Sequence, residues 1–152
     1  MNVNREKKTL SAKQYLSQLE MIDENINQDL ERLAQMKADA YGTGGIDYSK
    51  ERVQTSKVGD KLCSDISRYV AFDEQINAEI DRFVDAKEQI IKEIRGLHDK
   101  NFIQVLFKIY VQFKTVKIAS QEMKKSYSYT VELHKKALTA FEETYKNLHY
   151  IT

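Results

Sequence analysis

The feature that most constrains this chain is a run of apolar side chains, spaced alternately by four and three residues, between residues 62 and 97. Nine of its eleven positions are apolar, and only Asp73 and Lys87 interrupt it. Such spacing, sustained over about five heptads, is typical of a coiled-coil-like helix rather than an ordinary surface helix. At ~1.5 Å per residue, the helix is about 55 Å long. Its apolar stripe therefore needs a partner.

The first forty residues supply that partner. Heptad spacing recurs between Tyr15 and Ala40, and Ser11 is suited to cap a helix there. We expect helices over residues 12–41 and 60–96 to pack antiparallel as a helical hairpin, with a flexible loop at residues 42–59. Residues 22–37 also align without gaps to residues 72–87. The predicted seam, through which the hairpin forms and assembles, contains Leu19, Ile22, Ile26, Leu33, Leu62, Ile66, Tyr69, Ile76, Ile80, Phe83, Ile90 and Ile94.

A second apolar stripe of Val70, Val84 and Ile91 flanks this seam. A two-helix hairpin buries only one face of each helix, so the second stripe needs another surface. We therefore expect these helices to associate, either as a homo-oligomer or with the C-terminal part of the chain.

Composition permits long helices and limits the alternatives. Proline is absent, and four of the five glycines lie in the predicted loop, so little interrupts a helix elsewhere. No run approaches the roughly 18 apolar residues that a membrane span needs, and no signal peptide is recognised. The single cysteine, Cys63, excludes an intramolecular disulfide and suits a reducing compartment. We expect a cytoplasmic protein without a membrane partner.

The last third of the chain differs in charge and periodicity. Residues 1–98 carry 15 Lys/Arg against 18 Asp/Glu, a balance of −3, whereas residues 99–152 carry 9 Lys against 5 acids, a balance of +4. Asp99, Thr115 and Ser126 are suited to cap three short-linked helices, over residues 101–113, 116–123 and 127–150. The inward face of the last helix is predicted to contain Thr130, Leu133, Ala137, Phe141, Thr144 and Leu148.

Three such helices, the last two joined by a tight turn, are typical of a helix-turn-helix. The predicted protein is thus all-α, with a helical hairpin at residues 10–97 and a DNA-binding domain at residues 98–152. A recognition helix enters the major groove with its first turns, while flanking cations contact phosphates. Residues predicted to face the bases are Tyr127, Ser128, Val131, Glu132 and Lys135, of which Glu132 suits a cytosine amino group. Residues predicted to contact phosphates are Lys114, Lys117, Lys124, Lys125 and Lys136.

A resemblance supports this interpretation. The stretch IASQEM…S…LHKKALTAFEE resembles the helix-turn-helix of sigma-factor region four. Over most of residues 11–145 the chain also resembles small phage and prophage proteins of Gram-positive bacteria. The matching segments are SAKQYLSQLEMIDENIN, ERVQTSKVGDKL, INAEIDRFVDAKEQI and LHKKAL. That resemblance implies a phage transcriptional regulator of the ArpU or RinA kind, acting on double-stranded DNA in a bacterial host cell, with RNA polymerase as a candidate partner.

The chain departs from this family at the DNA-binding motif. Lys124 stands where the family usually has a turn glycine, and Lys117 replaces an acidic residue. Ser128 and Glu132 stand where the family has arginines on the recognition helix. The segment between Ile118 and Met123 is one residue longer than usual. These changes leave the sequence preference open, together with the strength of DNA binding.

Two other functions remain open at this stage. One is a phage DNA-packaging recognition subunit, and the other is a helical protein-interaction module that does not bind DNA. An enzyme is not expected, because His98, His134 and His149 lack metal-ligand spacing and no phosphate loop or nucleophile motif appears. His134 is expected on the helix surface or facing a phosphate. No cofactor or metal is predicted.

Overall fold

The computed structural model describes residues 8–41 and 55–151. This part of the chain is helical and contains no strand, which confirms the predicted all-α class. None of its helices is long and apolar enough to cross a membrane. In chain order the elements are α1 (Ala12–Leu16), α2 (Gln18–Tyr41), α3 (Thr55–Arg95), α4 (Lys100–Leu106), the π-helix η1 (Phe107–Val111), α5 (Val116–Glu122) and α6 (Tyr127–Thr144).

All four predicted helix caps are confirmed. The side chain of Ser11 accepts a hydrogen bond from the backbone of Gln14, whose own side chain accepts one from the Ser11 backbone, so that α1 begins with a capping box. Asp99, Thr115 and Ser126 accept hydrogen bonds from the first-turn amides of α4, α5 and α6. These short polar side chains satisfy amide groups that a helix leaves unpaired at its start.

Several predicted helix boundaries were wrong. Ser17 separates α1 from α2, so one helix does not run from residue 12 to residue 41. The last five residues of the predicted loop at 42–59 are the first turn of α3, and the rest of that loop lies outside the described residues. In the predicted helix 101–113, residues 107–111 are π-helical. The last helix ends at Thr144, which is exposed, and not at residue 150.

The chain divides into two compact units, and the division falls within α2 and α3. The central unit comprises residues 23–82, of which 23–41 and 55–82 are described. The terminal unit comprises residues 1–22 and 83–152, of which 8–22 and 83–151 are described.

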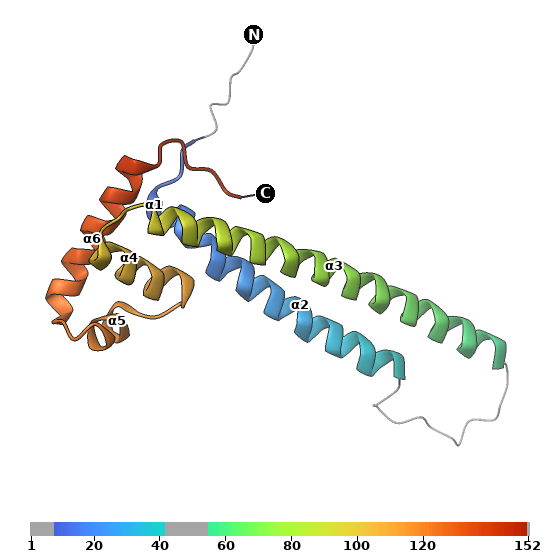
Figure 1. The fold of residues 1–152 in the computed structure, drawn as a ribbon. Helices are drawn as coiled ribbons and strands as arrows, with labels where there is room; N and C mark the ends of the chain where they lie inside the picture. The colour runs from blue at the N-terminus through green and yellow to red at the C-terminus, as the bar shows by residue number, and fades with distance from the viewer. Residues whose placement is uncertain (1–7, 42–54, 152) are drawn as a thin grey trace, which may run out of the picture. The chain divides into compact units, whose positions relative to one another are not determined.

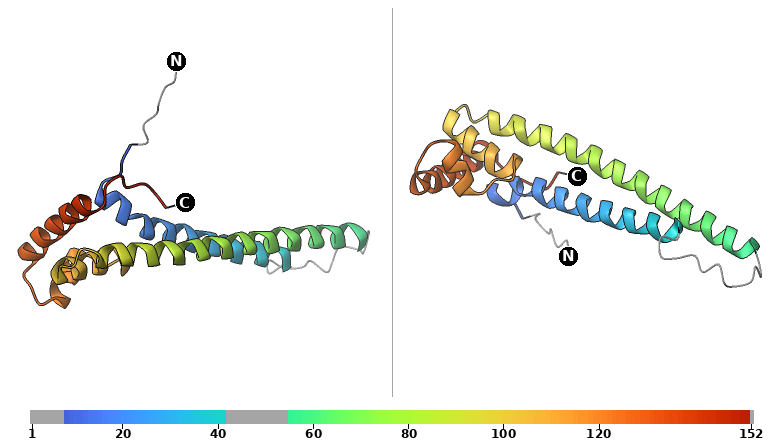
Figure 2. Two further views of the ribbon diagram at one scale, coloured as in Figure 1. Left: turned by 45° about the horizontal axis from the view of Figure 1, so that its top comes forward. Right: turned by 90° about the horizontal axis from the view of Figure 1, so that it is seen from below.

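In the central unit, α2 and α3 lie side by side and run in opposite directions (Figures 1 and 2). The hydroxyl groups of Tyr41 and Tyr69 are 2.6 Å apart, and the Arg32 guanidinium lies 4.9 Å from the centre of the Phe72 ring. Ile26, Leu33 and Ile76 are buried. These contacts join residues of α2 and α3 that are far apart in sequence.

In the terminal unit, one hydrophobic core joins both ends of the chain. It combines apolar side chains from α1, the start of α2, the end of α3 and the C-terminal elements. Backbone contacts reinforce it: the Leu10 amide donates to the Leu148 carbonyl at 2.8 Å, and the Ile151 amide donates to the buried Gln18 side chain at 2.9 Å. The C-terminal helices therefore share a core with residues 10–19 and 86–94, and the compact units do not follow the expected division at residue 97.

The predicted seam residues differ in burial. Six are buried, namely Leu19, Ile26, Leu33, Ile76, Ile90 and Ile94, and five are half-buried, namely Ile22, Ile66, Tyr69, Ile80 and Phe83. Leu62 is exposed in the single chain. Helix α2 ends at Tyr41, which contacts Tyr69 of α3. Leu62 lies two turns before Tyr69 in α3, beyond the end of α2.

Candidate nucleic-acid interface

A tight turn connects α5 to α6. The Lys125 amide donates to the Ser120 carbonyl at 2.9 Å, and the Lys124 amide donates to the Gln121 carbonyl at 3.2 Å. This pair of bonds is the Schellman arrangement, which ends a helix with one residue in the left-handed conformation. Lys124 takes that conformation, with φ of 57°, although a side chain costs about 1–2 kcal/mol there. The turn therefore forms with lysine in the place of the expected glycine.

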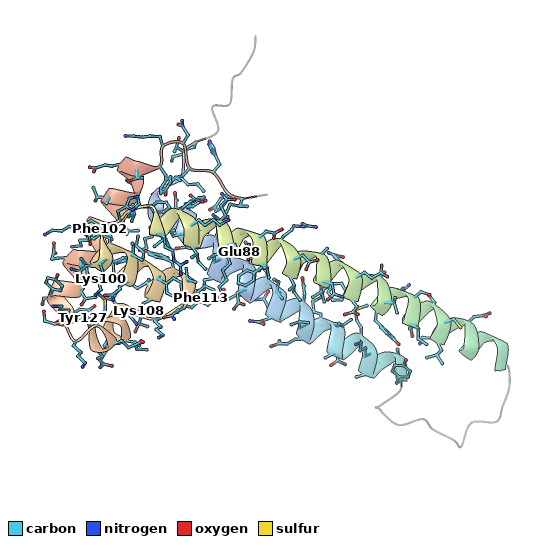
Figure 3. The ribbon with its side chains drawn as sticks, in the orientation of Figure 1. Glu88, Lys100, Phe102, Lys108, Phe113 and Tyr127 are labelled. Atoms are coloured by element: carbon cyan, nitrogen blue, oxygen red, sulfur yellow. The ribbon has the colours of Figure 1, made fainter. Side chains whose placement is uncertain are left out.

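Helix α6 has a buried face and an outward face. Thr130, Leu133, Ala137 and Phe141 are buried, as their spacing predicts. Ser128, Glu132 and Lys135 are spaced by four and three residues on the opposite side, and all three are exposed. Of the other residues predicted to face bases, Tyr127 (Figure 3) is 58% exposed at the first helical position. Val131 is half-buried.

The lysines predicted to contact phosphates fall into two groups. Four of them, Lys117, Lys124, Lys125 and Lys136, are exposed. The fifth, Lys114, is half-buried, and its Nζ atom lies 2.6 Å from Oε1 of Glu122. Lys108 of η1 contacts the same oxygen at 3.1 Å. Hydrogen bonds from Lys114 and then Lys108 lower the pKa of Glu122, so this carboxylate remains charged at neutral pH.

Side chains on the outward face also contact one another. The Lys125 ammonium lies 5.6 Å from the centre of the Tyr129 ring, and Lys135 lies 3.5 Å from the Glu132 carboxylate. The Lys135–Glu132 pair is highly exposed, so its contribution to stability is small. Lys125 and Lys135 can therefore exchange these contacts for contacts with a ligand at little cost in free energy.

Sequence reasoning missed a contact between α6 and η1. The hydroxyl of Tyr110 and Nε2 of His134 are 2.6 Å apart, and both side chains are at least half-buried. Burial lowers the pKa of His134, and the positive charge of Lys13 lowers it further. Burial raises the pKa of Tyr110 to about 12. The lowered pKa favours the neutral imidazole at pH 7. His134 was expected on the helix surface or facing a phosphate, and the structure shows it half-buried against Tyr110. The π-helical turn that carries Tyr110 has no sequence signature.

A shallow groove of about 360 Å³ also escaped the sequence analysis. It lies where Phe102, near the start of α4 (Figure 3), meets the middle of α6. Its lining residues are Phe102, Lys135, Lys136, Thr139, Ala140 and Glu143. Lys135 and Lys136 thus form part of a concave surface, which heptad and charge patterns alone could not indicate.

This surface can bind anions but has few groups suited to reading bases. Its cations are lysines, which contact phosphates as point charges and lack the planar fork with which arginine recognises guanine. No three His, Cys, Asp or Glu side chains converge as a metal site within residues 8–41 and 55–151. No family model, curated protein or solved structure matches the chain.

Proposed function

We propose that this protein is a phage-type transcriptional regulator that binds double-stranded DNA through a helix-turn-helix formed by α5, the turn at residues 123–126 and α6. The observation that carries the proposal is the exposed first half of α6, where Ser128, Glu132 and Lys135 share one face. The turn that precedes this face carries Lys124 and Lys125, both exposed. A helix presented in this way suits the major groove, with the turn beside the phosphates.

Most of the binding free energy is expected from phosphates. Four exposed lysines, at positions 117, 124, 125 and 136, are available for such contacts. Four contacts give a slope of log K against log salt of about −3.6, and thus an affinity loss of roughly 100-fold between 50 and 200 mM salt. Base discrimination rests on Ser128, Glu132 and Lys135. Because a single helix of this kind distinguishes sequences weakly, we propose that assembly through the N-terminal helices presents two or more copies to DNA.

The resemblance to sigma-factor region four adds a candidate partner. If α6 binds promoter DNA as that motif does, RNA polymerase is the partner expected for an activator. A repressor needs no such contact. Transcription from a bound promoter, with and without the protein, distinguishes the two roles.

A lysine double variant tests the DNA interface. Replacing Lys135 and Lys136 with alanine is expected to weaken binding across sequences and to make the salt slope shallower by about one to two. The matched control replaces Lys61 and Lys92, which are also exposed, and changes the net charge equally. Fluorescence anisotropy with a duplex of about 30 base pairs at several salt concentrations measures both slopes. If the two variants show equal slopes of log K against log salt, α6 is not part of the DNA interface.

A protein-interaction module is the second candidate. The charges on the exposed part of α6 are mixed, because Glu132, Glu142 and Glu143 accompany Lys135 and Lys136. The central unit also exposes Leu30 and Val70, at 42% and 45%. Absence of salt-dependent DNA binding at low ionic strength would favour this candidate. Selection of bound fragments from phage-genome DNA would favour the first and identify the target.

A further inference from the structure

Two lysines share one carboxylate oxygen beside the candidate interface. The Nζ atoms of Lys108 and Lys114 lie 3.1 and 2.6 Å from Oε1 of Glu122. Lys114 comes two residues before α5, and Glu122 is the last residue of that helix. The group therefore carries a net charge of +1, and one carboxylate neutralises only one of two ammonium ions.

The backbone places the two lysines together. Phe113 adopts a left-handed conformation with φ of 57°, which bends the chain back after η1. The Lys114 amide then donates to the Lys108 carbonyl at 3.0 Å. Both side chains thus start from adjacent points and reach the same oxygen. Their proximity follows from the fold and not from flexible side chains that meet by chance.

The cluster remains accessible to solvent. The side chains of Lys108, Lys114 and Glu122 are 22%, 31% and 34% exposed. An approaching anion can therefore reach Lys114, the more exposed lysine. When Lys114 leaves Glu122, Lys108 still neutralises the carboxylate, so the exchange leaves no unpaired charge.

We propose that Glu122 restrains Lys114 as an internal substitute for a DNA phosphate, and that Lys108 retains the carboxylate when Lys114 moves to the phosphate. This inference rests on the proposed DNA-binding function. Glu122 then lowers the affinity for DNA in general, because its charge both competes for Lys114 and repels the phosphate backbone. Lys108 raises the affinity without touching DNA, because it releases Lys114.

Two substitutions separate these roles. At a separation of about 7 Å in water, removing one negative charge near a phosphate changes affinity on the order of threefold. Glu122→Gln is therefore expected to bind a 30-base-pair mixed-sequence duplex about threefold more tightly, with a salt slope steeper by up to about 0.9. Lys108→Met is expected to bind about threefold more weakly. Glu31→Gln, at an exposed position of the central unit, removes the same charge as a control and is expected to change affinity less than about 1.5-fold.

The double variant tests the mechanism beyond simple charge effects. If Lys108 acts through Glu122, Lys108→Met costs much less affinity when residue 122 is already glutamine. Additive effects on the logarithm of affinity would overturn the proposal, as would an affinity of Glu122→Gln equal to that of the unaltered protein. Far-UV circular dichroism checks that each variant keeps its helices.

A measurement without DNA separates this inference from the proposed function. Inorganic pyrophosphate is titrated into the unaltered protein and into Glu122→Gln, and the backbone amide resonances of Lys108 and Lys114 are followed by NMR. We expect these resonances to shift at several-fold lower concentration in Glu122→Gln. Identical titrations would refute the restraint by Glu122, whether or not DNA binds. A difference with pyrophosphate, combined with no DNA binding by any variant, would support an anion site and refute the DNA-binding function.

Discussion

Replacing Gly96 with alanine adds one methyl group where the end of α3 meets Tyr145, the residue after α6. Gly96 follows the last residue of α3, and its amide donates to the Lys92 carbonyl at 3.0 Å. A Cβ atom there would overlap the hydroxyl of Tyr145 and lie 3.2 Å from the Glu93 carbonyl oxygen. That hydroxyl donates to the same carbonyl at 2.7 Å. The tyrosine must therefore move or lose its hydrogen bond.

The loss of unfolding free energy in Gly96→Ala depends on the contacts of Tyr145. Its ring packs 4.9 Å from the ring of Phe141, which is fully buried, so it cannot shift inward. An outward shift loses one hydrogen bond, worth about 1 kcal/mol, and strains the packing by about 1–3 kcal/mol. The lower chain entropy of unfolded alanine offsets about 0.4–1 kcal/mol. We expect a net destabilisation of about 2 kcal/mol, which lowers the melting temperature by about 4–8 °C.

Two control variants make this prediction specific. Gly59 lies in the first turns of α3 with no atom within 4 Å of an added Cβ, so Gly59→Ala is expected to stabilise by about 0.5–1 kcal/mol. Tyr145→Phe removes the atom that the new methyl group meets. Urea denaturation followed by far-UV circular dichroism compares all variants. Gly96→Ala would contradict this prediction if it were as stable as the unaltered protein. An unchanged loss of unfolding free energy when residue 145 is phenylalanine would contradict it as well.

Two further predictions concern His134 and the central unit. Because burial lowers the pKa of His134 in the folded protein, the unfolded chain takes up its proton first, and stability falls as the pH drops below about 6.5, the ordinary pKa of histidine. The urea midpoints at pH 7.5 and pH 5.5 should differ less for His134→Gln than for the unaltered protein. The same difference in both proteins would contradict a contribution of His134 to the pH dependence. Ile76 is 1% exposed, so Ile76→Ala is expected to cost about 2–4 kcal/mol. Val70→Ala, at a 45% exposed site, should cost under about 1 kcal/mol, and equal thermal shifts would refute the burial argument.

Local chemistry made the helix starts predictable. Ser11, Asp99, Thr115 and Ser126 each cap a helix through their own side chain, and this interaction involves only neighbours in the sequence. The inward residues of α6 were predictable for a similar reason, because helical spacing alone assigns them to one face. The end of α6 was not, because the residues that follow it contact distant segments: the Tyr145 hydroxyl donates to the Glu93 carbonyl, and the Leu148 carbonyl accepts from the Leu10 amide.

The sequence predicted which positions of the candidate interface are exposed, but not which of its lysines form ion pairs. Spacing placed Ser128, Glu132 and Lys135 together, and the structure exposes all three. Lys114 was predicted to be available, yet it contacts Glu122 eight residues later. That contact depends on the bend at Phe113, where a bulky residue takes a conformation that favours glycine.

The sequence by itself determined that this chain is helical, where most helices begin and which faces are apolar, because these properties depend on residues within one or two turns of each other. Only the tertiary structure decided what covers those faces. Leu19, Ile90 and Ile94 belong to a heptad pattern, yet they are buried in a core that also contains Phe141. A heptad specifies an apolar surface but not its partner, because hydrophobic burial has no direction and any complementary surface satisfies it.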